Sequence, residues 1–207
     1  MATSNAAMPT VSSPRRRSAS KRCRAAIGLV AVALWLWPHA AEATVYLSTE
    51  QALRLAFPSA QTITPADVTL TPEQQQRAAA MAGGPVPAAG PWTIYTATAG
   101  EQLLGRAVVM EEIGKYEPIT FLVAAGPDGR VLDVLILVYR ESRGGEVRRP
   151  NFLRQYRGKA AQDPIKVSQD IVNITGATLS ARAVSVGVRR ALALFSVVYG
   201  TVPAVAP

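Results

Sequence analysis

A short stretch rich in hydroxyl side chains, residues 173–180 (NITGATLS), has the composition of an anion-binding turn. It joins a segment predicted to be a strand to the start of a long predicted helix. The first backbone N–H groups of a helix have no partner within the helix and carry the positive end of its dipole, so they attract phosphate. Gly176 and Ala177 leave the backbone open to a ligand. The converging hydroxyls are those of Thr175, Thr178 and Ser180.

A second interpretation of the same residues is purely structural. Hydroxyl side chains commonly cap the first turn of a helix, and a glycine turn often precedes them. Short Gly/Ser/Thr motifs are also frequent by chance. From spacing alone, capping is the simpler explanation, and both interpretations stay open at this point.

Cysteine and histidine are confined to the first 43 residues. The only Cys is Cys23 and the only His is His39. Residues 44–207 therefore exclude a disulfide, a Cys or His nucleophile–base pair and a Cys/His zinc site. We assign no catalytic residue and no metal site. Redox chemistry in this part of the chain would need a cofactor that works without thiol or imidazole groups.

Residues 1–43 have the three parts of a secretory signal peptide. A basic segment precedes 13 charge-free apolar residues, 25–37, and Ala41-Glu42-Ala43 places small residues at −3 and −1 before Thr44. The apolar run is short compared with the ~20 residues that cross a bilayer. An uncleaved N-terminal anchor is the alternative. In both cases we expect residues 44–207 in the periplasm or at the outer face of the cytoplasmic membrane.

The positive charge of the chain belongs mostly to this leader. The formal net charge is +8, from 22 Lys and Arg against 14 Asp and Glu. Residues 1–43 hold six of the basic residues and one acidic residue, so residues 44–207 carry a net charge of only +3. The basic composition therefore does not indicate a nucleic-acid partner.

The remaining chain is predicted to form an α+β fold. Residues 48–57 and 71–81 begin with capping signatures and are predicted helices, and residues 82–91 form a Gly/Pro-rich linker. Strand composition follows, and residues 121–139 form a β-hairpin around the turn at 126–129. Because residues 131–139 are nearly all apolar, we expect that strand to be central. The predicted strands are residues 92–99, 105–110, 119–125, 131–139 and 167–174.

Two helices complete this prediction. A short helix is expected at residues 151–157, and a long one at residues 178–198. In the long helix, one stripe is apolar and another is polar, so we expect an amphipathic helix packed on a mainly antiparallel sheet. The apolar stripe holds Val184, Val188, Leu192 and Phe195, and the polar stripe holds Arg182, Ser185, Arg189 and Ser196.

Residues 175–180 (TGATLS) resemble the Ser/Thr-Gly-Ala-Thr-x-Ser/Thr signature of the bacterial FMN-binding domain family. The resemblance covers about residues 92–197. The family includes the flavin-carrying subunits of the Rnf and sodium-translocating NADH:quinone oxidoreductase complexes, and smaller exported flavoproteins, to which this chain is closer. In the family, the Thr after Gly-Ala holds FMN as a phosphoester, transferred from FAD by a Mg²⁺-dependent flavin transferase. Thr178 matches that Thr.

Two other stretches are similar to family segments. Residues 152–159 (FLRQYRGK) match an aromatic, Gln-aromatic, Gly-Lys pattern that ends at Lys159. Residues 141–145 (ESRGG) resemble a Glu-Thr-Pro-Gly-x-Gly loop that lies against the flavin, with Arg143 in place of Pro. The resemblance thus adds Glu141, Ser142, Gly144 and Lys159 to the cofactor-binding residues. The alternatives are a solvated basic turn for the loop and a surface charge for Lys159.

One position departs from the family pattern. The family usually has Asp six residues before the modified Thr, and Val172 stands there. Asp170 lies two residues earlier and would share a face with Val172 in a strand. We expect Asp170 to replace the missing carboxylate in recognition by the transferase, and an ordinary strand-end carboxylate is the alternative. Arg143, Arg148 and Arg149 are expected to form a positive patch near the flavin.

The resemblance therefore implies an exported electron-transfer flavoprotein with FMN on Thr178. It would act as a carrier or as part of an oxidoreductase system rather than as a complete enzyme. Its partners would be the transferase and a membrane-associated redox donor and acceptor. The alternatives are a module that binds an anionic ligand without redox chemistry, and a redox protein with non-covalent FMN. The predicted organisation is a leader at 1–43, a helical segment and linker at 44–91, the FMN-binding domain at 92–198 and a tail at 199–207.

Overall fold

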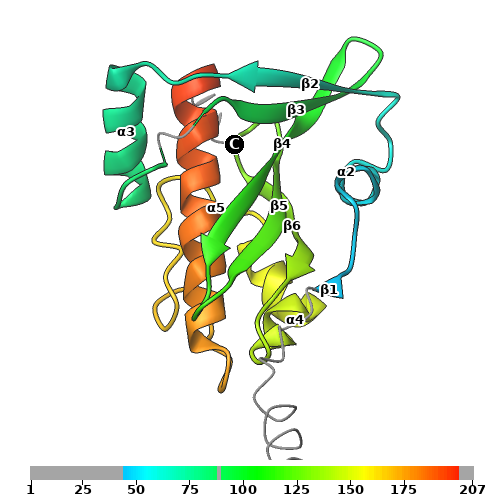
Figure 1. The fold of residues 1–207 in the computed structure, drawn as a ribbon. Coiled ribbons are helices and arrows are strands. Elements are labelled where there is room, and N and C mark those ends of the chain that lie inside the picture. The colour runs from blue at the N-terminus through cyan, green and yellow to red at the C-terminus, as the bar shows by residue number, and fades with distance from the viewer. Residues whose placement is uncertain (1–43, 88–89, 201–207) are drawn as a thin grey trace, which may run out of the picture. The chain divides into compact units, whose positions relative to one another are not determined.

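The computed structural model describes residues 44–87 and 90–200, which form the α+β fold that the sequence predicts. The predictions for residues 1–43 and for residues 201–207 lie outside this part of the chain. The described residues form a six-stranded antiparallel sheet in the order β1-β6-β5-β4-β3-β2 (Figure 1). Its strands are β1 (Thr44–Val45), β2 (Thr62–Val68), β3 (Trp92–Ala99), β4 (Gln102–Ile113), β5 (Pro118–Ala125) and β6 (Val131–Tyr139).

Helices cover both faces of the sheet. The long helix α5 (Thr178–Tyr199) lies against one face with α3 (Pro72–Ala82) beside it, and α2 (Thr49–Ala56) lies on the other face (Figure 1). Two short 3₁₀ helices, η1 (Gly145–Arg148) and η2 (Arg154–Tyr156), flank α4 (Pro150–Leu153). Among the described residues, no helix is long and apolar enough to cross a membrane.

The first two helices begin as the sequence predicts. The side chain of Ser48 accepts from the backbone N–H of Gln51, and the side chain of Gln51 accepts from the backbone N–H of Ser48. Thr71 and Gln74 form the same reciprocal pair at the start of α3. Both are capping boxes, so local sequence alone determines where these helices start.

The predicted polar stripe of α5 is only partly open to water. Arg182 is exposed, but Ser185 is only 2% exposed, and its hydroxyl bonds to the Tyr156 hydroxyl at 2.8 Å. Arg189 is half-buried and donates to the backbone carbonyls of Ala82 and Ile165. Because α3 and the chain after η2 pack on the side away from the sheet, Ser185 and Arg189 bond to buried groups of the protein instead of water.

Strand β6 is an interior strand of the sheet, as its composition suggested. It pairs with β5 on one side and with the two-residue edge strand β1 on the other. Its side chains are apolar on both faces because α4 and its flanking 3₁₀ helices lie over one face and α2 over the other. Residues 62–68 also form a strand, β2, which the local pattern does not predict. Pro65 argues against a strand, but β2 is an edge strand, where a missing N–H is tolerated.

Residues 167–174 do not form the predicted strand. Only an isolated bridge joins Val167 and Ile171, with turns between them. The carboxylate of Asp170 accepts from the backbone N–H groups of Ile165 and Lys166 and so closes a turn. These hydrogen bonds outweigh the β-propensity of the residues in the segment. Asp170 and Val172 therefore do not share a strand face.

Candidate functional site

The N-terminus of α5 has no capping side chain. Thr178 is its first residue, and the N-cap is Ala177, for which the described residues provide no side-chain cap hydrogen bond. The hydroxyls expected there are engaged elsewhere or exposed: Ser180 is buried and turned toward β6, and Thr175 is exposed. The capping interpretation is therefore wrong. The first N–H groups of a 22-residue helix remain available to an anion.

Asn173 fixes the hydroxyl of Thr178. Its side-chain amide N–H donates to Thr178 Oγ at 2.9 Å, and its amide oxygen accepts from the backbone N–H of Ile174 at 2.8 Å. Gly176 has φ of +85°, a left-handed conformation that favours glycine and turns the chain into the helix. The Thr178 oxygen thus has a defined position, and its own proton is not used in this contact.

The loop after β6 is joined to the start of α5 by one buried tyrosine. The Tyr139 hydroxyl donates to the backbone carbonyl of Arg143 at 2.6 Å and lies 2.9 Å from Ser180 Oγ. Burial raises the pKa of Tyr139 and outweighs the hydrogen bond to Ser180, so its proton stays in place at neutral pH. Gly144 completes the junction. A Cβ there would lie 2.7 Å from the Tyr139 hydroxyl and 2.8 Å from Ser180 Oγ.

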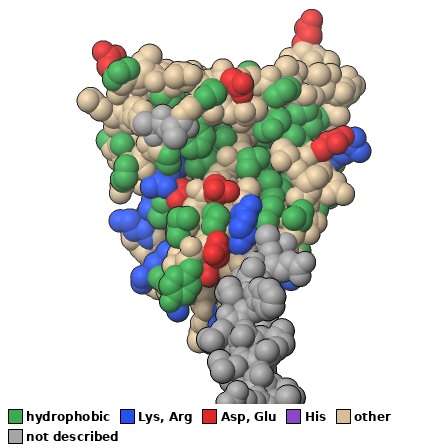
Figure 2. All heavy atoms as spheres, in the orientation of Figure 1, with side chains coloured by type: hydrophobic (Ala, Val, Ile, Leu, Met, Phe, Trp, Pro, Cys, Tyr) green, Lys and Arg blue, Asp and Glu red, His purple; other side chains and the backbone are tan. Residues whose placement is uncertain are grey.

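The three predicted arginines do gather beside this turn. Arg143, Arg148 and Arg149 line a shallow hollow of about 890 Å³, and Gly176 also lines it. The guanidinium of Arg148 also stacks 4.0 Å from the centre of the Tyr46 ring. Figure 2 shows Lys and Arg side chains along the lower left of the drawn face, at the level of the N-terminal half of α5. The hollow has the charge expected of a site for phosphate or another anion.

Glu141 forms hydrogen bonds to a turn of the sheet. Its carboxylate accepts from the backbone N–H groups of the β4–β5 turn, those of Lys115, Tyr116 and Glu117. Partial burial would raise the pKa of Glu141, but these three hydrogen bonds hold it below its ordinary value. Ser142 and Gly144 line the anion hollow, whereas Glu141 lines a neighbouring one.

Lys159 and Asp170 contact each other and not the 175–180 turn. Lys159 Nζ lies 2.8 Å from Asp170 Oδ2, and both side chains are mostly buried. Partial burial would raise the pKa of Asp170, but the Lys159 contact and two backbone N–H groups lower it. The backbone of Lys159 pairs with Val131, at the end of β6 opposite Tyr139. The pair therefore supports the loop that leads to Asn173.

The roles of two residues of this site, Asn173 and Tyr139, were not predicted from the sequence. Asn173 precedes a glycine turn, where Asn commonly bonds to nearby backbone, so its presence was a usable signal. Tyr139 ends an apolar strand, and nothing in its local pattern indicates a partner 41 residues away.

Comparisons with known proteins match the part of the chain that contains this site. Residues 114–193 match the family model described as the FMN-binding domain. The chain is 33% identical, over 106 residues, to one of the subunits of the proton-translocating ferredoxin:NAD(+) oxidoreductase complex of Clostridium ljungdahlii. This match covers 47% of the chain and 57% of that relative, so the chain spans little more than half of its length.

Solved structures with a similar arrangement share little sequence. NqrC of Shewanella oneidensis matches with a TM-score of 0.47 and 15% identity, over 73% of this chain and 88% of that one. A chain of the Na(+)-translocating NADH-quinone reductase of Parabacteroides distasonis matches with a TM-score of 0.45 and 13% identity, over 73% and 83%.

Proposed function

Because residues 114–193 belong to the FMN-binding domain family, we propose that this chain is an exported electron-transfer flavoprotein that carries FMN as a phosphoester on Thr178. The observation that carries the proposal is the uncapped start of α5 with the Thr178 hydroxyl held by Asn173. Helices α2 and α3 each begin with a capping box, whereas α5, the longest helix of the described residues, has no side-chain cap.

The residues present fit the phosphate of FMN. The free N–H groups of the first turn of α5 would bond to its oxygens, and the helix dipole would favour its charge. Gly176, whose Cβ position is open, lets the ligand approach the backbone. Arg143, Arg148 and Arg149 would offset the remaining negative charge from the hollow beside the turn.

FMN would supply one- and two-electron transfer, which residues 44–207 cannot provide through Cys or His. The chain would hold the phosphate end at Thr178 and set the charge around the cofactor through the arginine-lined hollow. We assign no second substrate site to this function, so the role of a carrier within a larger redox system fits better than that of a complete enzyme. A ferredoxin:NAD(+) oxidoreductase component among the relatives supports redox donors and acceptors as partners.

Attachment would need a partner enzyme. A Mg²⁺-dependent flavin transferase would move the FMN part of FAD onto Thr178 Oγ, with AMP and the hydroxyl proton as the other products. Thr178 is half-buried and lies next to the exposed residues Gly176 and Leu179, so an enzyme can reach it. We propose that Asp170 assists recognition by positioning the loop before Asn173, since its carboxylate is held by Lys159 and two backbone N–H groups.

Export is the remaining part of the proposal. The composition of residues 1–43 supports a signal peptide or an N-terminal anchor, followed by the flavin domain at 92–198. A covalent bond suits a protein outside the cytoplasm, because dilution cannot remove the cofactor. The mature N-terminus is expected at Thr44, and N-terminal sequencing of the exported chain distinguishes cleavage from anchoring.

Loss of the Thr178 hydroxyl should abolish covalent flavin. We expect no fluorescent band from Thr178→Ala on a denaturing gel under ultraviolet light, and no FMN adduct in the peptide of residues 167–182. Thr175→Ala is the matched control and should keep the adduct, because the Thr175 side chain is exposed and makes no hydrogen bond to the site residues described above. Both variants should unfold like the wild type, since neither hydroxyl caps α5.

Other results would select the alternative functions. Flavin that survives denaturation on Thr178→Ala would contradict the assignment. Yellow FMN released from the wild type by denaturant would indicate a redox protein with non-covalent FMN. A colourless wild type, purified from a host that has the transferase, would indicate a module that binds another anion.

A further inference from the structure

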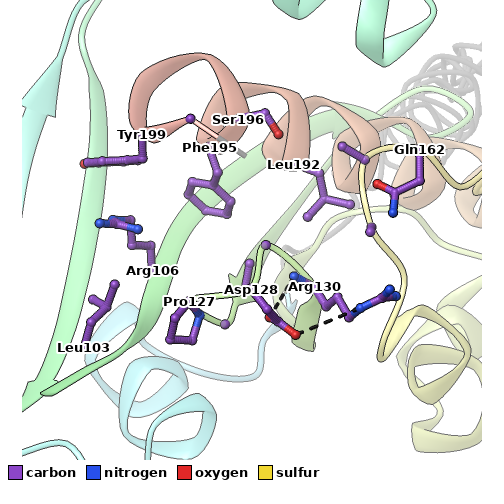
Figure 3. A pocket seen from close by; sticks show the side chains of 16 residues that line it. Leu103, Arg106, Pro127, Asp128, Arg130, Gln162, Leu192, Phe195, Ser196 and Tyr199 are labelled. Carbon is purple, nitrogen blue, oxygen red and sulfur yellow. Dashed lines mark hydrogen bonds and ion pairs between the residues drawn. The ribbon is translucent and has the colours of Figure 1, made fainter. Parts of the chain in front are cut away.

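A second cavity lies at the other end of α5. It has a volume of about 650 Å³ and is walled by β4, the β5–β6 turn, residues 160–162 and the last turns of α5 (Figure 3). Leu192 is its first lining residue on α5, about 20 Å along the helix from Thr178 at 1.5 Å per residue. The cavity is therefore separate from the proposed flavin attachment site.

A β-bulge places Arg106 and Leu103 in the same cavity. Residues three apart on a regular strand point to opposite faces of the sheet. Here the β3–β4 register shifts, because Ala97 pairs with Gly105 and Thr98 with Leu103. The extra residue brings both side chains to one wall, as Figure 3 shows. Gly105 is required at the bulge, since a Cβ there would lie 2.3 Å from the carbonyl oxygen of Ala125.

The guanidinium of Arg106 lacks hydrogen-bond and ion-pair partners within the described residues. It stacks 3.8 Å from the centre of the Tyr199 ring. The N–H groups, which lie in the plane of the guanidinium, are not used by this contact. Its Nε is buried without a hydrogen-bond partner, and Arg106 makes no ion pair within the described residues. Leaving a buried donor of a charged group unpaired is unfavourable, and the Nε of Arg190 shares this state. Because Arg106 also lines the cavity, its guanidinium can bond to an acceptor that enters from outside.

The other arginine of the cavity is already partnered. Arg130 donates to the backbone carbonyl of Gly158 at 2.7 Å and lies 4.0 Å from Asp128. Arg106 therefore supplies the uncompensated positive charge. Phe195, Leu192 and Pro127 form an apolar part of the wall, and Gln162 and Ser196 add polar groups to it (Figure 3).

We propose that this cavity binds a small organic carboxylate with an apolar ring body. The carboxylate would accept the free N–H groups of Arg106, whose planar fork matches two oxygens. The ring would pack on Phe195 and Leu192. The volume falls in the range of small-molecule sites. The inference does not depend on flavin attachment, which occurs at the opposite end of α5.

Calorimetric titration of the full chain with 2-naphthoate tests the proposal. We expect saturable binding of naphthoate, at least about tenfold weaker binding of the neutral isostere 2-naphthamide, and little binding of inorganic phosphate. Arg106→Gln should weaken naphthoate binding about 10- to 100-fold, and Arg106→Lys should weaken it too because it loses the fork. Arg77→Gln, an exposed arginine on α3, is the matched control and should bind normally.

The following outcomes would overturn the proposal: no naphthoate binding at millimolar concentration, equal binding of the amide, or unchanged binding by a folded Arg106→Gln. The last result would mean that Arg106 only balances the carbonyl groups at the end of α5. Circular dichroism checks folding, and Arg106→Lys provides the test if the Gln variant unfolds. Thr178→Ala should bind naphthoate normally, so the cavity and the flavin site can fail independently.

Discussion

At the residue scale, the candidate site depends on where a few side chains send their hydrogen bonds. Asn173 holds the Thr178 oxygen, and Tyr139 takes up Ser180, so the first N–H groups of α5 are left for a ligand. Glu141 carries a carboxylate but uses it to hold the turn between β4 and β5. Side chains with similar chemistry thus have different roles, which their surroundings decide.

Val172→Asp should raise covalent flavin loading without destabilising the fold. The Val172 side chain is 73% exposed, so a charge there costs at most about 0.5 kcal/mol of unfolding free energy. The measurement is flavin per folded molecule when the transferase is limiting. Val172→Asn is the control, because the Asn side chain has the shape of Asp without its charge. Equal loading of the Asp and Asn variants would show that the carboxylate does not matter.

Asp170→Asn should lower flavin loading by loosening the loop before Asn173. The amide keeps one acceptor oxygen but loses the charge that pairs with Lys159 and the two backbone N–H groups. We expect the fully formed fold with faster amide hydrogen exchange in residues 163–173. Unchanged exchange together with lower loading would favour direct recognition of Asp170 by the transferase.

Glu141 should make the stability of the chain fall at acidic pH. Because its pKa is lowered in the folded state, its stabilisation is present above the ordinary pKa of 4.5 and is lost as the pH falls through the lower folded value. We expect Glu141→Gln to unfold at lower urea concentration than the wild type at pH 7, and the difference to shrink as the pH falls below 4.5. A difference that does not shrink with falling pH would show that the contribution is not that of a carboxylate.

At the element scale, the site is a junction between the loop after β6 and the start of α5. Tyr139 and Ser180 join the two elements, and only a glycine fits between them at position 144. The loop brings Arg143 and Arg148 to the hollow beside Gly176. Close approach of these two elements is therefore what gathers the positive charge at the proposed phosphate site.

Gly144→Ala should separate these elements and reduce flavin loading. A Cβ would lie within 2.8 Å of both hydroxyls, and φ is +88°, so we expect a loss of about 1–3 kcal/mol of unfolding free energy. Gly158→Ala is the matched control, with φ of +78° and open space around its Cβ. It should lose some stability but no flavin. Equal loading of the two variants would show that the junction does not shape the site.

At the scale of the whole molecule, one buried ion pair joins the sheet to α5. Arg190 Nη1 lies 2.6 Å from one carboxylate oxygen of Glu112, and Glu112 is 8% exposed. Burial raises the pKa of Glu112, and the hydrogen bond and charge of Arg190 reverse this only in part. The pair fixes how α5 lies on β4, and α5 carries the proposed flavin site at one end and the proposed carboxylate cavity at the other.

Arg190→Met should destabilise the whole chain in a pH-dependent way. It leaves a buried carboxylate unpaired, which costs about 3–5 kcal/mol at pH 7. Since the folded state binds the Glu112 proton more tightly than the unfolded state, the loss should shrink as the pH falls through the raised pKa toward 4.5. Urea unfolding at pH 5 and pH 8 measures this. The Glu112→Gln/Arg190→Met double variant should lose less, and an equal loss at both pH values would contradict the mechanism.

Local sequence determined much of this protein. The strands at 92–99 and 131–139, both capping boxes, and the turn that leads into α5 follow from short-range periodicity and from bonds between residues a few positions apart. The TGATLS stretch likewise indicated a resemblance to the FMN-binding domain family, whose model matches residues 114–193, and a candidate attachment residue, because its residues act together within a single turn.

Tertiary structure decided what these elements do together. The Tyr139–Ser180 contact spans 41 positions, and the register of β6 and the docking of α5 set it, which no local pattern encodes. Asp170 turned a β-prone segment into a turn because its carboxylate captured backbone N–H groups and Lys159. The bulge at Gly105 placed Arg106 in a cavity through a pairing shift between strands. Long-range packing chooses among partners that are chemically equivalent in the sequence, and so only the folded chain shows which hydroxyls and charges remain free.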